Sequence, residues 1–156
     1  MKGYEQTGVI SINDLRFPSK KHFKKGVAVI ECIQRIPCDP CVDACPVNAI
    51  SMNDINDPPV IDYDRCTGCG TCIAVCPGLA IFLVKIQGDE AFVSLPYEFL
   101  PIPKVGEKVE MLDREGKKRG EAEVMKVKKI GKTAVITVAV DKNLAMEVRN
   151  IRVKQV

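Results

Sequence analysis

The chain has 156 residues and a formal net charge of +3, with 46% hydrophobic and 28% charged residues, a composition that excludes a disordered chain. No apolar run approaches the roughly 20 residues of a transmembrane helix, so we expect no membrane span. Residues 1–26 carry six basic and two acidic side chains, and residues 27–92 carry three basic and nine acidic ones. In residues 93–156 there are 14 basic and nine acidic side chains. The middle segment is therefore acidic and a poor partner for nucleic acid, and we expect no nucleic acid to bind it.

Residues 1–26 form a basic N-terminal extension without the basic-then-apolar order of a secretory signal, so we expect a cytoplasmic protein. Thiols stay reduced in that compartment, and the eight cysteines therefore indicate metal binding rather than disulfides. In this extension Lys20, Lys21, Lys24 and Lys25 surround His22, the single histidine. The basic run predicts a solvated face, and the alternative is that it attracts an acidic partner or tethers the chain to a partner subunit. A further alternative is that His22 is a ligand of a metal cluster.

The segment 27–92 alternates short apolar strands with single helical turns. This order predicts two βαβ-like halves whose strands are almost continuously apolar. We predict strands at 27–30, 49–52, 60–61 and 80–86, helical turns at 42–44 and 73–75, and a turn-rich connection at 53–59.

The cysteines form two related motifs in this segment. The second reads C-x2-C-x2-C-x3-C-P and the first C-x5-C-x2-C-x3-C-P. A shift of 31 residues superimposes the last three cysteines and the proline of each motif, but it places Cys66 on Arg35. Cys32 therefore lies three residues upstream of its place in the repeat. The cysteines are Cys32, Cys38, Cys41 and Cys45 in the first motif and Cys66, Cys69, Cys72 and Cys76 in the second.

Three cysteines at i, i+3 and i+6 on a tight loop can wrap their thiolates around one cluster of several irons. The loop backbone must then approach the inorganic sulfides closely, and Gly68 and Gly70 suit this because glycine adopts positive φ without strain. The first loop has Asp39 and Pro40 instead. It must turn differently, and it lacks one N–H donor at the proline.

Residues 27–86 resemble a bacterial-type dicluster ferredoxin, on the strength of these two motifs. The resemblance implies two 4Fe–4S clusters, each with three thiolates from its own motif and a fourth from the other. Cluster I would bind Cys32, Cys38, Cys41 and Cys76, and cluster II would bind Cys45, Cys66, Cys69 and Cys72.

Three other interpretations of the cysteines stay open. Two structural zinc sites would need knuckle pairs that lie further apart. Disulfides are disfavoured because C-x2-C-x2-C crowds its thiols on one loop. In the third, Cys32 is an ordinary buried residue at the end of a strand, and cluster I is an incomplete or 3Fe–4S cluster.

After residue 92 the pattern changes to half-buried β-strands. The ranges 93–95, 108–112, 121–128, 133–140 and 148–153 are predicted strands, with polar turns at 113–120 and 130–132. Strands this short and numerous suggest a small closed barrel at 93–156, joined to segment 27–92 through the proline-rich residues 95–106. The predicted fold class is thus α+β, a dicluster ferredoxin (βαβ)2 core followed by a barrel-like all-β domain, either a stabilising cap or a docking module.

No catalytic constellation, phosphate-binding glycine loop or flavin fingerprint occurs, so we expect a carrier of single electrons rather than an enzyme. The stretches ECIQRIPCDPCVDACPVNAI, SLPYEFLPIP and LAMEVRNIRV are similar to the small ferredoxin subunit of FAD-dependent dehydrogenases that oxidise amino or imino acids such as proline. This resemblance implies flavoprotein partner subunits that hold the FAD, no flavin in this chain, and an external acceptor such as another ferredoxin or a quinone.

Two further functions remain as alternatives. One is a freely diffusing ferredoxin with an accessory domain. The other is a metal-stabilised module that binds protein, or binds nucleic acid through its basic ends.

Overall fold

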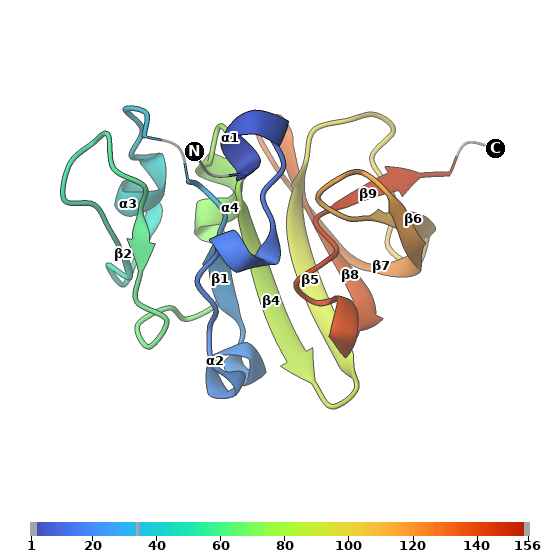
Figure 1. Ribbon diagram of the computed structural model, residues 1–156. Coiled ribbons are helices and arrows are strands. Elements are labelled where there is room, and N and C mark those ends of the chain that lie inside the picture. Colours follow the sequence, from blue (N-terminus) through green and yellow to red (C-terminus); the bar gives the residue numbers. More distant parts are fainter. Residues whose placement is uncertain (1–2, 34, 155–156) are drawn as a thin grey trace.

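The computed structural model describes residues 3–33 and 35–154 (Figure 1). Its main element is a seven-stranded antiparallel sheet with the strand order β1-β4-β5-β8-β7-β6-β9. These strands are β1 (Val27–Ile30), β4 (Ile81–Gln87), β5 (Glu90–Tyr97), β6 (Lys108–Leu112), β7 (Lys118–Ile130), β8 (Thr133–Asp141) and β9 (Asn150–Val153). A second sheet pairs β2 (Ile50–Ser51) with β3 (Val60–Ile61).

The helices are short and lie on the side of the main sheet where β1 and β4 are found (Figure 1). They are α1 (Gly3–Thr7), α2 (Lys20–Lys25), α3 (Pro40–Ala44) and α4 (Thr71–Val75), with 3-10 turns at Ile12–Asp14 and Lys142–Leu144. None of the described helices has the length and apolar character that a bilayer crossing requires.

The cysteine-rich part has the mixed α and β elements that its sequence predicts. Strands and helical turns occur in each predicted range, and α3 packs beside α4. The two halves are joined by pairing, because β1 runs antiparallel to β4 and β2 antiparallel to β3. The core of this part holds Val27, Ile73 and Ile81 together with three buried cysteines.

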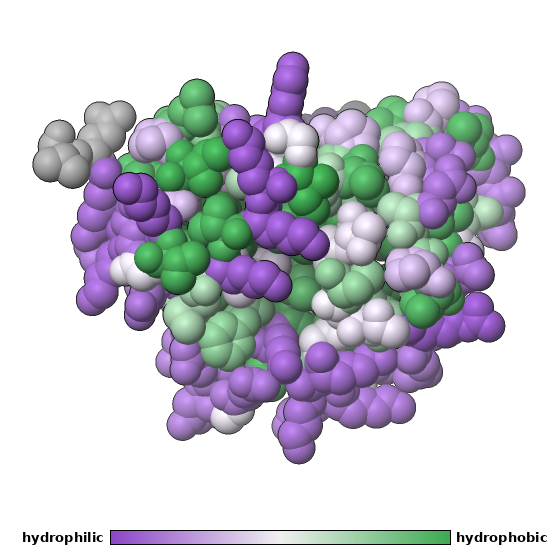
Figure 2. Space-filling model, turned by 180° about the vertical axis from the view of Figure 1, so that it is seen from behind, coloured by the Kyte–Doolittle hydropathy of each residue, from purple (hydrophilic) through white to green (hydrophobic). Residues whose placement is uncertain are grey.

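The C-terminal part contains the predicted strands, but the closed barrel is not confirmed. In the described residues the main sheet is open, with β1 at one edge and β9 at the other. It is curled, so that β9 approaches β5 and Val93, Val109 and Ile151 share one core. From behind, hydrophilic side chains form most of the outline, and hydrophobic patches lie between them (Figure 2).

One sheet therefore runs through both parts of the chain. The predicted boundary between residues 92 and 93 lies inside β5, which pairs with β4 on one side and β8 on the other. Gly88, at φ 63°, and Asp89 join β4 to β5 in a two-residue hairpin turn. This tight turn keeps β5 in register with β4, so the strand starts at Glu90 rather than at Val93.

The basic extension packs onto the cysteine-rich part rather than standing free. Helix α2 lies against β4, and the His22 ring is hydrogen-bonded at both nitrogens, to Ser19 at 2.8 Å and to Asp64 at 2.7 Å. Lys25 donates to the Asp64 carbonyl at 3.2 Å. His22 therefore positions the chain just before Cys66 instead of presenting a nitrogen to a metal.

Candidate metal centres

The structure gathers the cysteines into two groups of four. The thiols of Cys76, Cys32 and Cys38 all lie close enough to Cys41 to act on its ionisation. The same four side chains line one cavity, whose apolar walls are Ile30, Pro40, Pro59, Pro77 and Ile81. Cys32, the residue displaced from the repeat, thus belongs to the first group.

The second group surrounds Cys72 in the same manner. Its electrostatic neighbours are Cys66, Cys69 and Cys45, and these four line a second cavity. Each cavity thus takes three cysteines from one motif and one from the other, the arrangement that the resemblance implied. The crossing cysteines are Cys45 and Cys76, which follow directly after α3 and α4.

The two crossing cysteines occupy identical turns. The residue three positions after each, Asn48 and Leu79, has φ 53°. This left-handed residue turns the next amide back, so that the Ala49 N–H donates to Cys45 Sγ at 3.2 Å and the Ala80 N–H to Cys76 Sγ at 3.4 Å. N–H donors stabilise the negative charge of a thiolate ligand. Leucine adopts positive φ at a cost of roughly 1 kcal/mol, and this turn was not foreseen from the sequence.

The second loop depends on a close approach between two glycines. Gly68 and Gly70 both have positive φ, as predicted, at 73° and 77°. A Cβ at Gly68 would lie 2.7 Å from the carbonyl oxygen of Gly26, whereas one at Gly70 would meet no atom closer than 3.7 Å. The approach of Gly68 to Gly26 brings the start of β1 to this loop, where the Ala28 N–H donates to Cys66 Sγ at 3.4 Å.

The longer first loop turns differently, as its aspartate and proline require. Asp39 has φ −139° and Pro40 opens α3, where no N–H is needed. The Cys38 N–H donates to the Ile55 carbonyl at 3.2 Å, and Arg35, at the position equivalent to Cys66, pairs with Asp57 at 2.8 Å. Cys38 and Arg35 thus bind the loop to the 53–59 connection.

Burial and mutual repulsion control the ionisation of the thiols. Desolvation, with a smaller contribution from Cys76, raises the pKa of Cys41 to about 11. Desolvation and the thiols of Cys66 and Cys69 raise the pKa of Cys72 to about 12. Desolvation also acts on the exposed Cys69, but hydrogen bonds with Thr71, Thr67 and the backbone of Cys69 together outweigh it and lower its pKa.

These pKa shifts predict the order of alkylation in metal-free protein. Iodoacetamide should modify Cys69 faster than Cys72, because the thiolate is the reactive form and Cys72 is protonated below about pH 12. Well below that pKa, the Cys72 rate should rise about tenfold for each pH unit. Tandem mass spectrometry over a pH series measures both rates. Equal rates at the two positions would show that the metal-free chain does not keep this arrangement.

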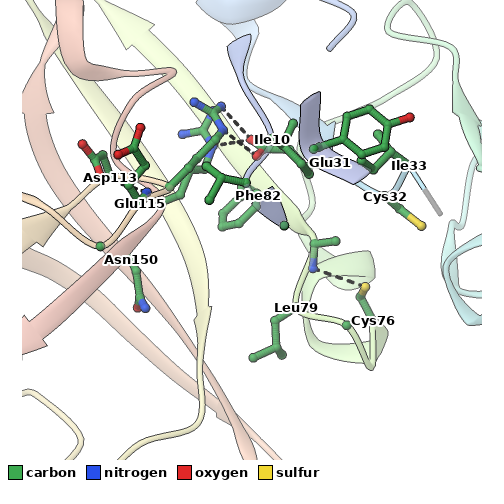
Figure 3. A pocket seen from close by; sticks show the side chains of 18 of the residues that line it. Ile10, Glu31, Cys32, Ile33, Cys76, Leu79, Phe82, Asp113, Glu115 and Asn150 are labelled. Carbon is green, nitrogen blue, oxygen red and sulfur yellow. Dashed lines mark hydrogen bonds and ion pairs between the residues drawn. The ribbon is translucent and has the colours of Figure 1, made fainter. Parts of the chain in front are cut away.

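A buried ion cluster lines a third cavity, which adjoins the first through Cys32, Cys38 and Cys76 (Figure 3). No pattern in the sequence indicated this ion cluster. Arg114 donates to both oxygens of Glu31, at 2.8 and 2.9 Å, and Arg149 donates to the same carboxylate. Burial alone would raise the pKa of Glu31, but its hydrogen bonds and the charges of both arginines hold the pKa below its usual value. We call these three residues the Glu31 triad.

The donor set fits iron–sulfur clusters. Four thiolates per site are the usual ligands of a 4Fe–4S cluster, and backbone N–H groups point at the sulfurs of Cys45, Cys66 and Cys76. No disulfide joins any of the eight cysteines. In residues 3–33 and 35–154, no three His, Cys, Asp or Glu side chains are grouped to hold a single metal ion; the thiols of each group surround a cavity instead.

Families and proteins with similar sequences are described as 4Fe–4S or ferredoxin-like. Residues 31–80 match a family described as a 4Fe–4S dicluster domain, and a second family of the same description matches residues 58–129. The polyferredoxin-like subunit of an aliphatic sulfonate oxidoreductase from Pyrococcus furiosus is 43% identical over 47 residues, 30% of this chain and 27% of that protein. No solved structure is significantly similar to the chain.

Two further relatives come from bacteria and archaea. The ferredoxin-type protein NapF of Haemophilus influenzae is 37% identical over 37% of this chain and 35% of its own. One component of an ion-translocating oxidoreductase complex from Methanosarcina acetivorans is 39% identical over 38% of this chain and 20% of its own. The matched segment is thus no more than about a third of each of these three relatives.

The dicluster matches cover all eight cysteines. The chain is therefore an iron–sulfur protein with two 4Fe–4S clusters. Its relatives include subunits of oxidoreductases.

Proposed function

We propose that this chain is the electron-relay subunit of a larger oxidoreductase, and that its clusters are bound across the two motifs. Cluster I is held by Cys32, Cys38, Cys41 and Cys76, and cluster II by Cys45, Cys66, Cys69 and Cys72. The observation that carries this proposal is the pair of cavities, each lined by four thiols from both halves. When bound, the clusters supply one-electron steps, and the chain fixes their positions and surroundings.

The partner we propose is a flavoprotein dehydrogenase that oxidises amino or imino acids in the cytoplasm. Its FAD would take two electrons from the substrate, and the relay would pass them singly to a ferredoxin or a quinone. Membership of a complex is supported by the relatives, several of which are oxidoreductase subunits. The C-terminal part of the chain also supports it. There Phe99, Leu100 and Val105 expose 63%, 85% and 65% of their surface, as a docking module would.

Co-purification from native cells tests the complex. A tag on this chain should retain a second polypeptide with bound FAD, in constant ratio to the iron. If the chain instead elutes alone and exchanges electrons as a monomer, it is a freely diffusing ferredoxin and the subunit proposal is wrong.

Cys32→Ser tests the one ligand that departs from the repeat. We expect the loss of about one cluster, or its conversion to a three-iron form, while the other cluster stays intact. Iron content and electron paramagnetic resonance of the reduced protein measure this. Cys69→Ser is the matched control, because it removes a ligand of the other cavity. Two intact clusters with unchanged spectra would show that Cys32 is not a ligand.

A further inference from the structure

The Glu31 triad holds more positive than negative charge in a buried place. Glu31 and Arg149 each expose 6% of their surface, and the side chain of Arg114 exposes 10%. Guanidinium groups keep their proton in proteins, so two cations face one carboxylate. Among the acidic groups nearby, Glu115 pairs with Lys117, whereas Asp113 and Glu147 share Arg119 and so leave one negative charge in excess. That charge is partly solvated, because the Glu147 and Arg119 side chains expose 34% and 40% of their surface, and the buried triad itself keeps a net charge of +1.

This excess charge has a cost that the triad alone does not offset. Removing charges from water is unfavourable unless opposite charges compensate them. Burial lowers the pKa of Arg149, and the neighbouring Arg114 cation adds to that effect, even though Glu31 and, more weakly, Glu147 oppose it. Arg149 also donates to the carbonyls of Ala145 and Val148 and lies 5.1 Å from the Phe82 ring centre. These contacts hold the cation in place without neutralising it.

The triad is connected to the ligands of cluster I. Glu31 directly precedes Cys32, and its N–H donates to the carbonyl of Ala80, whose own N–H donates to Cys76 Sγ. Arg114 and Arg149 line the third cavity, which shares Cys32, Cys38 and Cys76 with the cavity of cluster I but does not include Cys41 (Figure 3). In the described residues, neither four-thiol cavity has a charged side chain in its wall apart from its cysteines, but the cavity that holds the arginines includes cysteines of cluster I and none of cluster II.

We propose that the Glu31 triad raises the reduction potential of cluster I above that of cluster II. The inference rests on the proposed function, in which cluster I is bound by Cys32, Cys38, Cys41 and Cys76. Four thiolates leave an oxidised 4Fe–4S cluster with a net charge of about −2, and reduction adds one more negative charge. The net positive charge of the triad compensates that charge, and the acidic cluster in turn compensates the buried arginines.

Redox titration of the reconstituted full chain, followed by electron paramagnetic resonance, tests this. The cluster I signal is the one that Cys38→Ser removes. Arg114→Gln should lower the reduction equilibrium constant of cluster I about tenfold, which is about 59 mV for a one-electron couple. Arg114→Lys keeps the charge and should largely restore the potential. Glu31→Gln removes a negative charge and should shift cluster I in the opposite direction, which structural damage would not do.

The control is Arg152→Gln, which removes an exposed arginine of β9 that pairs with Glu110 and lines none of the three cavities, and it should leave both potentials unchanged. Shifts of the same sign in Arg114→Gln and Glu31→Gln, or no shift in either, would overturn the proposal. If Arg114→Gln does not assemble cluster I, the two reduction potentials of the unmodified chain test the proposal instead. A higher potential for cluster I than for cluster II supports it, and a lower one rejects it. Failure of the proposed function is distinct, because it appears in the unmodified chain, either as missing iron or as elution of the chain alone as an electron-carrying monomer.

Discussion

Replacing Cys76 with serine should remove the cluster of the first motif, although Cys76 belongs to the second motif in sequence. The reason is that Cys76 lines the cavity of Cys32, Cys38 and Cys41. We expect iron content to fall by about half. The reciprocal change, Cys45→Ser, should remove the cluster of the second motif.

Double variants show which cysteines share a cluster. Cys38→Ser combined with Cys76→Ser should lose no more iron than either change alone, because both affect one site. Cys69→Ser combined with Cys76→Ser should lose both clusters. Iron and sulfide assays of anaerobically reconstituted protein measure these losses. The opposite pattern would be the loss of both clusters in Cys38→Ser with Cys76→Ser and the loss of only one cluster in Cys69→Ser with Cys76→Ser. It would show that each motif binds its own cluster with all four of its cysteines.

Gly68→Ala should strongly destabilise the holoprotein. Its Cβ would lie 2.7 Å from the Gly26 carbonyl oxygen, and its φ of 73° disfavours a side chain. Left-handed strain costs roughly 1–2 kcal/mol, and forced displacement of packed backbone adds about 1–3 kcal/mol. The loop that carries Cys66 and Cys69 must move, so the cluster bound there should be lost faster on heating.

Gly70→Ala is the matched control for this effect. Gly70 has nearly the same φ, 77°, but its added Cβ would make only an ordinary contact at 3.7 Å. It should therefore show the strain without the collision, and Gly78→Ala, where nothing lies within 4 Å, should change little. The measurements are the midpoint of thermal unfolding and the rate of bleaching of the visible absorbance. Equal effects of Gly68→Ala and Gly70→Ala would mean that the contact with Gly26 does not matter.

Local patterns in the sequence predict much of this fold. The apolar run 27–30 and the segment 108–112 coincide with β1 and β6, because short strands between turn residues have clear boundaries. The grouping of the cysteines also follows the resemblance to dicluster ferredoxins, including the place of Cys32 beside Cys41 and Cys76. Positive φ at Gly68 and Gly70 was predictable because glycine is the residue that tolerates it.

Features that depend on distant residues were not predictable. Arg114 and Arg149 lie 83 and 118 positions from Glu31, and charged residues in a sequence are expected to be exposed. The Gly88-Asp89 turn was the available signal that β5 continues the sheet of β4. The positive φ of Leu79 could not be expected from a leucine, but its repeat partner Asn48 is a residue that adopts this conformation.

Quantifying iron and acid-labile sulfide in the anaerobically purified chain tests the two-cluster assignment most directly. Two four-iron clusters predict eight irons and eight sulfides per polypeptide, with none of the eight cysteines open to alkylation until the clusters are removed. Bound zinc without sulfide, or four irons or fewer after full reconstitution, would contradict it.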